Sequence, residues 1–229
     1  TLENLANQTI GLKTLHIVLA MEEREDDARE KAEILISEYK SKFGSIFATY
    51  HPDLPGEVKG KSSNEAFGGR VAHQQFFVEG KLDIDYATVS SVDADAIFDK
   101  QYFAYLSYKF LSDNKRYNKF WQSAVVFYNN IWKLPFYARV KNSMSSLFNA
   151  ARLVRTDKLI PFSTYTTSFW VIKEIGFWTP WVTPEDFHLY LKAQFKFGSK
   201  VSTHPVFLRI MSDAAEGKGH VDTIRNNYM

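Results

Sequence analysis

The chain opens with an apolar strand pattern, an amphipathic helix and a second apolar strand, and this order of elements strongly limits its fold. Residues 14–20 form an apolar run that is typical of a buried strand. Residues 26–43 then place apolar side chains at helical spacing, and Gly44 ends that helix before a second strand over residues 45–50. A strand, a helix and a strand in this order predict an α/β domain with parallel strands.

The same alternation continues along the chain. We expect a helix from Ser62 or Ser63 to residue 77, a strand over 84–92, a helix from a cap at Asp99 to residue 110, a strand over 121–128, a helix over 135–154 and a helix that begins at Glu185. The Ser/Thr-rich residues 162–168 read as a loop. With 229 residues, 45% of them hydrophobic, the chain can build one sizeable core. We therefore predict one layered α/β domain over residues 1–229, with a mostly parallel sheet.

The composition excludes several classes of protein. A formal net charge of +2, without a basic stripe, argues against a nucleic-acid partner. Because the chain has no cysteine, it has neither disulfides nor thiolate metal sites. No run approaches the ~18 to 20 apolar residues of a membrane span, so we expect the chain itself to be soluble.

Two acidic motifs suggest chemistry. The triplet Asp93-Ala94-Asp95 follows a predicted strand, and the pair Glu185-Asp186 opens a helix far downstream. Two carboxylates one residue apart at the carboxyl end of a strand can hold a hard divalent cation, which can bind the phosphates of an activated substrate. The later pair is then a candidate for a separate base. Both motifs also have an ordinary structural reading, since Asp is common in turns and in the first turn of helices.

Three segments, in this order, carry a resemblance to a known family. Residues 59–64, Lys-Gly-Lys-Ser-Ser-Asn, are similar to a Lys-x-x-x-x-Asn donor loop, residues 93–95 to an Asp-x-Asp motif, and residues 183–186, Thr-Pro-Glu-Asp, to a Thr-Glu-Asp base motif with one residue inserted. On these segments the chain resembles the inverting glycosyltransferases of family 2, and more narrowly the processive, membrane-associated branch with the cellulose and hyaluronan synthases. The resemblance covers nearly the whole chain and implies the GT-A fold, a Rossmann-like three-layer αβα sandwich.

The resemblance also implies a reaction and its main residues. A sugar would pass from a nucleotide-diphosphate sugar, with a UDP-sugar as the first choice, to a hydroxyl of a carbohydrate or lipid-linked acceptor, with inversion. Asp186 would be the general base, with Glu185 beside it in the substrate site. Mg²⁺ or Mn²⁺, held by Asp95 with Asp93 toward the metal or the ribose, would neutralise the departing diphosphate.

Further residues are assigned to the donor by the same resemblance. Lys59 or Lys61 would place positive charge near the diphosphate or the sugar, and Asn64 would hydrogen-bond a sugar or ribose hydroxyl. Glu22 or Glu23 would contact the nucleobase. The structural alternative for the loop residues is a solvated surface, and for the two glutamates it is the exposed start of a helix.

The acceptor side is assigned to aromatic and hydroxyl side chains. Trp178 and Trp181, close in sequence to Asp186, are candidates for stacking on a sugar face, although burial is the usual role of Trp. Ser163, Thr164 and Tyr165 are candidates for the lining of the acceptor pocket, with an ordinary loop as the alternative. His220, in a Gly-rich segment, occupies a place where some GT-A enzymes have a third metal ligand.

Two parts of the family pattern do not occur in this sequence. Residues 1–8 resemble the family's first helix, without the first strand and its Pro-x-x-Asn-Glu turn, and the Gln-x-x-Arg-Trp motif is absent. We therefore expect this fragment to be impaired or inactive. The resemblance places its parent in the cytoplasm, at the cytoplasmic face of a membrane, and attached to that membrane through segments outside this chain. Two alternatives stay open: a nucleotidyltransferase, and a non-catalytic module that binds a nucleotide or a sugar.

Overall fold

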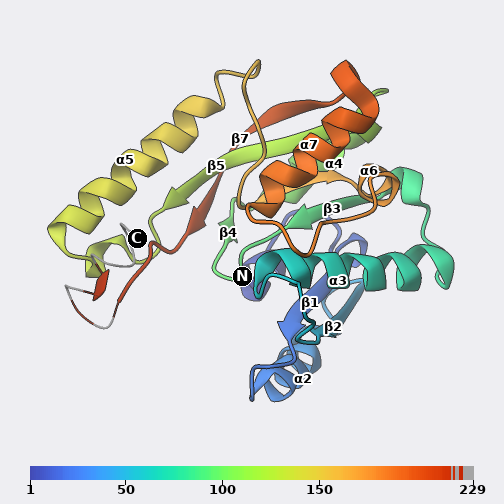
Figure 1. The fold of residues 1–229 in the computed structure, drawn as a ribbon, viewed down its shortest axis with the longest axis horizontal. Coiled ribbons are helices and arrows are strands. Elements are labelled where there is room, and N and C mark those ends of the chain that lie inside the picture. Colours follow the sequence, from blue (N-terminus) through green and yellow to red (C-terminus); the bar gives the residue numbers. More distant parts are fainter. Residues whose placement is uncertain (218, 220–221, 224–229) are drawn as a thin grey trace.

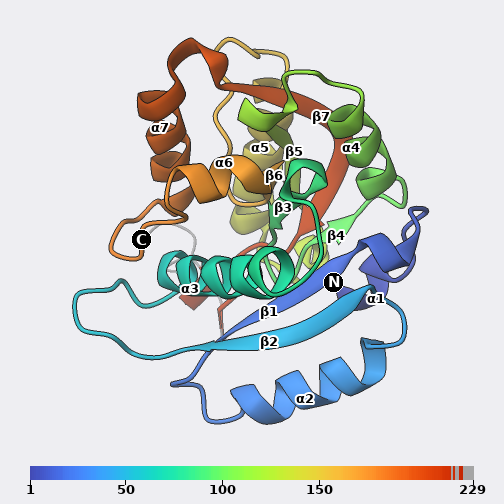
Figure 2. The ribbon, with the colours of Figure 1, turned by 90° about the vertical axis from the view of Figure 1, so that its right-hand side faces the viewer.

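The N-terminal part of the chain is a parallel strand pair between two helices. The computed structural model describes residues 1–217, 219, 222 and 223. Strands β1 (His16–Glu22) and β2 (Ser45–His51) pair in parallel. Helix α2 (Ala28–Tyr39) covers one face of this pair and α3 (Lys61–His73) covers the other (Figure 2). The predicted order of strand, helix and strand is confirmed, because apolar periodicity indicates the type of element. Two details are wrong: β1 is only partly buried, and α2 ends at Tyr39 rather than at Gly44.

A second, five-stranded sheet has the strand order β3-β6-β5-β7-β4. Its strands are β3 (Thr88–Ser91), β4 (Ile97–Phe98), β5 (Lys119–Phe127), β6 (Tyr165–Ser168) and β7 (Ser202–Ser212). Strands β5 and β7 run parallel, whereas the pairs β3–β6, β5–β6 and β4–β7 are antiparallel. The α/β class is confirmed, but the prediction of one mostly parallel sheet is wrong: among the described residues there are two sheets, and the larger one is mixed.

Strand β6 is the main reason for the mixed sheet. It lies in the segment that the sequence predicts to be a Ser/Thr-rich loop, and all four of its residues are buried. The Thr167 hydroxyl donates to the Lys119 carbonyl (2.9 Å), and the Ser90 and Thr166 hydroxyls share a hydrogen bond (2.7 Å). Because these hydroxyls find partners inside the sheet, a polar segment can form a buried strand. It runs antiparallel to both of its neighbours, β3 and β5.

The remaining helices pack around the larger sheet. They are α4 (Tyr102–Leu111), α5 (Phe136–Arg152), α6 (Phe169–Glu174) and α7 (Glu185–Phe197), in agreement with the predicted helices over 99–110 and 135–154 and from Glu185. Figure 1 shows α5 along β5 on one side of the molecule. The shorter helical segments are α1 (Leu2–Leu5), η1 (Leu12–Thr14), η2 (Gln74–Val78), η3 (Ile84–Tyr86), η4 (Arg116–Asn118), η5 (Ile131–Lys133) and η6 (Gly198–Lys200).

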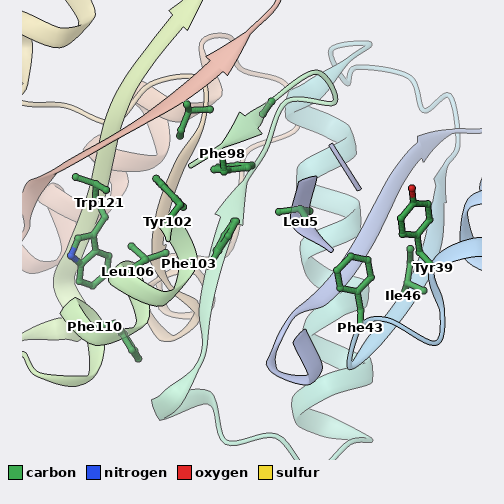
Figure 3. Close-up of a cluster of buried hydrophobic side chains, with 13 residues drawn as sticks. Leu5, Tyr39, Phe43, Ile46, Phe98, Tyr102, Phe103, Leu106, Phe110 and Trp121 are labelled. Atoms are coloured by element: carbon green, nitrogen blue, oxygen red, sulfur yellow. The ribbon is translucent and has the colours of Figure 1, made fainter. Parts of the chain in front are cut away.

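One buried cluster joins the two sheets (Figure 3). The N-terminal part contributes Leu5, Tyr39, Phe43 and Ile46, and the larger sheet with α4 contributes Ala96, Phe98, Tyr102, Phe103, Leu106, Phe110, Trp121, Val206 and Ile210. On β5, Phe120 joins a different cluster, with residues of β6, α6 and α7. The successive residues Phe120 and Trp121 of β5 therefore pack on opposite faces of the sheet, as expected for a strand that is covered on both sides.

In the part of the chain that the structure describes, no helix has the length and apolar character needed to cross a membrane.

Candidate functional site

Side chains from four separate segments meet just beyond the end of β3. Asp93 lies two residues after this strand, Lys61 is the first residue of α3, Ser163 precedes β6, and Asp186 lies in the first turn of α7. The Lys61 ammonium donates to Asp93 Oδ1 (2.6 Å) and to the Ser163 carbonyl (2.7 Å). The predicted donor-loop lysine, the first aspartate of the triplet and the loop before β6 are therefore in direct contact.

Ser163 connects the two acidic motifs. Its hydroxyl donates to Asp93 Oδ2 (2.5 Å), and its backbone N–H donates to Asp186 Oδ2 (2.7 Å). Its φ of 55° lies in the left-handed region, which is uncommon for a residue with a side chain and is found preferentially at functional sites. Because one residue holds a carboxylate of each motif, residues 93 and 186 lie side by side although 93 positions separate them in the sequence.

The Asp186 carboxylate is buried and oriented by the backbone. Its Oδ1 accepts a hydrogen bond from the Phe187 N–H (2.6 Å), in addition to the bond from Ser163 to its Oδ2. Both N–H groups belong to the backbone. The positive end of the α7 helix dipole also stabilises the negative charge of this carboxylate. Each carboxylate oxygen can accept more than one hydrogen bond, so Asp186 keeps capacity for a substrate hydroxyl.

One lysine faces several carboxylates in this site. Lys61 Nζ lies 3.9 Å from both Glu65 Oε1 and Glu185 Oε1, beside its bond to Asp93. Glu65, one turn along α3, was not singled out from the sequence, although its i,i+4 spacing from Lys61 could have drawn attention to it. With Asp186, the cluster holds four carboxyl groups and one ammonium group, an excess of acid that suits a cationic or metal-bound ligand.

The protonation equilibria of the cluster reflect burial and the Lys61 charge. Burial raises the pKa of Glu65 to about 8, against the opposing effects of Lys61 and of a hydrogen bond from the Ser91 hydroxyl. Burial would also raise the pKa of Asp93, but the Lys61 charge and the hydrogen bonds from Lys61, Ser163 and Thr164 outweigh it and lower that pKa. At neutral pH Glu65 is therefore mostly protonated, while Asp93 is ionised.

The two aspartates of the triplet have different partners. Asp95 Oδ2 accepts hydrogen bonds from the Ser212 hydroxyl (2.7 Å) and the Asp213 N–H (2.6 Å), at the end of β7. Asp93 is instead bound by Lys61 and Ser163. Within the described ranges, no group of three or more His, Asp or Glu side chains is arranged to hold a metal ion. Asp95 is a hard oxygen ligand suited to Mg²⁺, which proteins often bind through one or two carboxylates together with substrate phosphates. His220 lies outside the described residues.

The other donor residues lie at the carboxyl ends of β1 and β2 or near them. Glu22 pairs with Arg24, and Glu23 pairs with Arg29 (2.6 Å) on the surface. Lys59 is exposed and pairs with Asp53 (2.5 Å). Glu22 and Lys59 both line a narrow pocket with residues 51–54, 57 and 58. Glu22 and Lys59 are thus near one another. Among the described residues, none of the three side chains bonds directly to the cluster around Ser163.

Asn64 has a structural bond and an unused acceptor. Its Nδ2 donates to the Ala20 carbonyl of β1 (2.7 Å), which ties α3 to the strand. Its buried Oδ1 has no hydrogen-bond partner among the described residues. A buried acceptor without a partner is energetically unfavourable. A ligand hydroxyl would reach this oxygen only if the structure opened around it.

The two predicted stacking tryptophans differ in accessibility. Trp178 is buried, and its indole N–H donates to the Tyr165 hydroxyl (2.8 Å). A stacking role for Trp178 would require the structure to open. Trp181 is 63% exposed and its ring is accessible to a ligand.

A largely apolar groove of about 520 Å³ leads to Ser163. It lies between β5, α5 and the loop before β6, and it is lined by Val125, Phe127, Met144, Ser145, Phe148, Asn149, Phe162 and Ser163. The sequence predicts the helix over 135–154 but not this groove, because the exposure of the apolar side chains of α5 depends on how the helix packs.

No protein-family model matches this chain, and no curated protein matches it. The assignment of a function therefore depends on the geometry of the site.

Proposed function

We propose that this domain is the catalytic part of a glycosyltransferase that moves a sugar from a nucleotide-diphosphate sugar to an acceptor hydroxyl with inversion. The observation that supports this proposal is the junction at Ser163, which holds a carboxylate from the Asp-x-Asp motif and one from the Thr-Pro-Glu-Asp motif. An inverting transfer needs the diphosphate and the base on opposite sides of one sugar. In the proposed GT-A arrangement, the β1–β2 unit and the five-stranded sheet together form the platform.

The donor would lie toward Lys61 and Asp93. The Lys61 ammonium is the group best placed to contact a phosphate or a sugar hydroxyl, and it would exchange part of its bonding to Asp93 for the ligand. Asp95 would hold Mg²⁺ or Mn²⁺, and the ion, when bound, would supply positive charge to the departing diphosphate. Glu22 or Glu23, at the carboxyl end of β1, would contact the nucleobase side of the donor.

Asp186 would act on the acceptor hydroxyl. Its carboxylate is fixed by the N–H groups of Ser163 and Phe187, so little reorganisation is needed when it accepts a proton. The groove that ends at Ser163 offers the acceptor a path to this carboxylate. Because most of its lining is apolar, it favours the lipid-linked acceptor over a purely polar one among the two acceptor classes.

A first experiment measures binding, which requires no acceptor. The change in melting temperature with UDP and Mn²⁺ would be compared for the wild-type chain, Asp95→Ala, Lys61→Met and the matched control Asp157→Asn, whose carboxylate pairs with Arg155 on the surface. We expect stabilisation in the wild type and in the control, and at least a tenfold weaker apparent affinity in the other two variants. Equal stabilisation of all four proteins would contradict the proposed donor site.

A second experiment measures turnover. Release of nucleoside diphosphate from a panel of nucleotide sugars should fall at least 100-fold in Asp186→Asn, without loss of nucleotide binding. Asp157→Asn should keep wild-type turnover. If nucleotide binding depends on Asp95 but no donor is turned over, the chain is a non-catalytic binding module. The ion pair between Lys61 and Asp93, which already satisfies both groups, is the observation that favours this second candidate.

A further inference from the structure

The outer face of α5 is apolar although it is exposed. Five large apolar side chains occur at helical spacing on it, with exposed fractions from 46% to 74%: Phe136, Val140, Met144, Leu147 and Phe148. At about 100° per residue, these positions fall within an arc of about 120° on the helix surface. We call this set the α5 apolar stripe. Contiguous exposed apolar side chains of this kind mark contact surfaces rather than ordinary solvent-facing positions.

The inner face of α5 has the opposite character. The buried residues of the helix are Ala138, Asn142, Ser146 and Asn149. Asn149 Nδ2 donates to the Val125 carbonyl (2.9 Å), and the Ser146 hydroxyl accepts from the Phe127 N–H (3.0 Å). The helix is thus held to β5 by small and polar groups. A helix with the usual pattern buries its apolar side, so α5 is inverted and its apolar side is directed away from the protein.

Basic side chains border the α5 apolar stripe. Helix α5 has no Asp or Glu, and its basic residues are Arg139, Lys141 and Arg152. By the same helical spacing, Lys141 and Arg152 border the stripe on one side and Arg139 borders it on the other. Trp132, four residues before Phe136, is 73% exposed, and Trp is enriched where proteins meet the membrane interface.

We propose that the outer face of α5 docks on the surface of an anionic lipid bilayer. A helix with an apolar arc, basic borders and an aromatic end lies in the plane of the interface, with its apolar side chains below the head groups. The basic borders would contact acidic lipid head groups, which attract Lys and Arg near the surface. With 17 residues, α5 is about 26 Å long and would lie flat, because its inner face remains bound to β5.

The charge pattern favours a bilayer over a second copy of the chain. In a symmetric dimer the two stripes would face each other, and their basic borders would also meet and repel. An anionic surface instead satisfies the apolar arc and the basic borders at the same time. The docked orientation would also bring the groove residues Met144 and Phe148 to the interface, where a lipid-linked acceptor would be found. The docking itself does not depend on the proposed reaction.

Vesicle binding tests this proposal with the full chain. Sedimentation with vesicles of 70% phosphatidylcholine and 30% phosphatidylserine would be compared with phosphatidylcholine alone, for the wild type, Leu147→Glu and the matched control Phe195→Glu. Phe195 is an apolar residue of α7 that is 88% exposed and lies outside the stripe. We expect binding to the anionic vesicles that falls with added salt, at least tenfold weaker binding for Leu147→Glu, and unchanged binding for the control. Circular dichroism and the melting temperature check that each variant is folded.

Three results would overturn the proposal. The first is equal vesicle binding by folded Leu147→Glu and the wild type. The second is equally tight binding to neutral vesicles, which would leave the basic borders without a role. The third is a wild-type dimer in light scattering that Leu147→Glu converts to a monomer without any vesicle binding, which would assign the stripe to a second copy. None of these measurements uses a nucleotide sugar, so they fail or succeed separately from the proposed function.

Discussion

Replacement of Glu65 by Gln should change how the stability of the fold depends on pH. The Glu65 side chain is 14% exposed, accepts a hydrogen bond from the Ser91 hydroxyl, and has a buried Oε2 without a partner among the described residues. Its pKa is about 8, against a reference value of 4.5. Between these two pH values the folded state binds a proton that the unfolded state has released. The stability from this group is therefore fully present below pH 4.5 and is lost as the pH rises through 8.

The size of this effect follows from the pKa difference. A difference of about 3.5 units, at about 1.4 kcal/mol per unit, sets a ceiling of about 5 kcal/mol for the loss between pH 4.5 and pH values above 8. Contact with Lys61 and with solvent screens part of this cost, so we expect about 2 to 4 kcal/mol. The Glu65→Gln variant keeps the shape and polarity of the protonated acid but cannot ionise. It should therefore avoid this loss.

Urea unfolding from pH 5 to pH 9 measures the effect. His16, His73, His188 and His204 also titrate in part of this range, because burial lowers the pKa of each, and they raise stability as the pH increases. These histidines are common to both proteins, so the difference in unfolding free energy between the wild type and Glu65→Gln isolates Glu65. The variant should gain about 2 to 4 kcal/mol relative to the wild type across the range. Glu33→Gln, an exposed substitution on α2, controls for the loss of a charge. Parallel curves for wild type and Glu65→Gln would refute the reasoning.

Three further predictions concern single contacts, each measured by urea unfolding. Lys61→Met should lower the unfolding free energy by about 1 to 3 kcal/mol, because Asp93 loses its ion pair. The effect should become smaller at pH values below the pKa of Asp93, where this carboxylate is protonated. An unchanged unfolding free energy at pH 7 would show that the ion pair does not stabilise the fold. Ser163→Gly should be about 1 kcal/mol more stable than Ser163→Ala, because both variants lose the hydroxyl but only Gly adopts a φ of 55° without backbone strain. The reverse order of stability would show that the backbone at this residue is unstrained. Gly69→Ala should cost about 1 to 3 kcal/mol because its Cβ would lie 2.8 Å from Trp178 Cζ3, whereas Gly11→Ala, with no atom within 4 Å, serves as the control.

The elements with strong local patterns could be predicted from the sequence. Residues 14–20, 26–43 and 45–50 correspond closely to β1, α2 and β2. Each of these segments has an apolar pattern that is typical of its type of element. Helix α7 could also be predicted, since Glu185 and Asp186 stand where acidic residues favour a helix start.

The strands of the larger sheet depended on tertiary contacts. Strand β7 contains Pro205, a residue that argues against a central strand, and its pairing with β5 shifts in register between Ser123 and Val125. Pro205 itself is in register with Gln122, before this shift, and strand β4 on the other side of β7 pairs only with Ile210 and Met211. The chain accommodates the proline because, in the described part of the chain, β7 has a single neighbouring strand at this position. Strand β3 is shorter than predicted, since residues 84–86 form the turn η3. Neither feature has a local sequence pattern that would reveal it.

The site was predictable in its residue types and only partly in its geometry. The sequence selected Lys61 or Lys59, Asp93 and Asp186 for one substrate site, because the carboxyl end of a strand and the start of a helix are frequent places for ligand-binding groups. In the structure Lys61 bonds Asp93, and Ser163 bonds both aspartates.

The sequence assigned Asp95 to a metal and Asp93 to the metal or the ribose. In the structure a turn at residues 94–95, with a hydrogen bond from the Ala96 N–H to the Asp93 carbonyl (3.0 Å), directs the two side chains to different protein partners. Ser163 holds a carboxylate of each acidic motif because its backbone adopts a left-handed conformation, and no pattern in the sequence predicts that conformation.

Ser163 also connects the polar cluster with the apolar groove, and this shared position has a mechanical consequence. Its carbonyl accepts from Lys61, its N–H and hydroxyl hold Asp186 and Asp93, and its side chain lines the groove. The neighbouring Phe162 ring packs under Arg152 of α5 at 4.5 Å. A molecule that enters the groove must therefore contact the segment that sets the separation of the two carboxylates. Helix α5 forms the other wall of the groove, so contact of α5 with a bilayer would act on the same segment. The position of Asp186, the proposed base, and the entry of an apolar acceptor would then be coupled through the loop that contains Ser163.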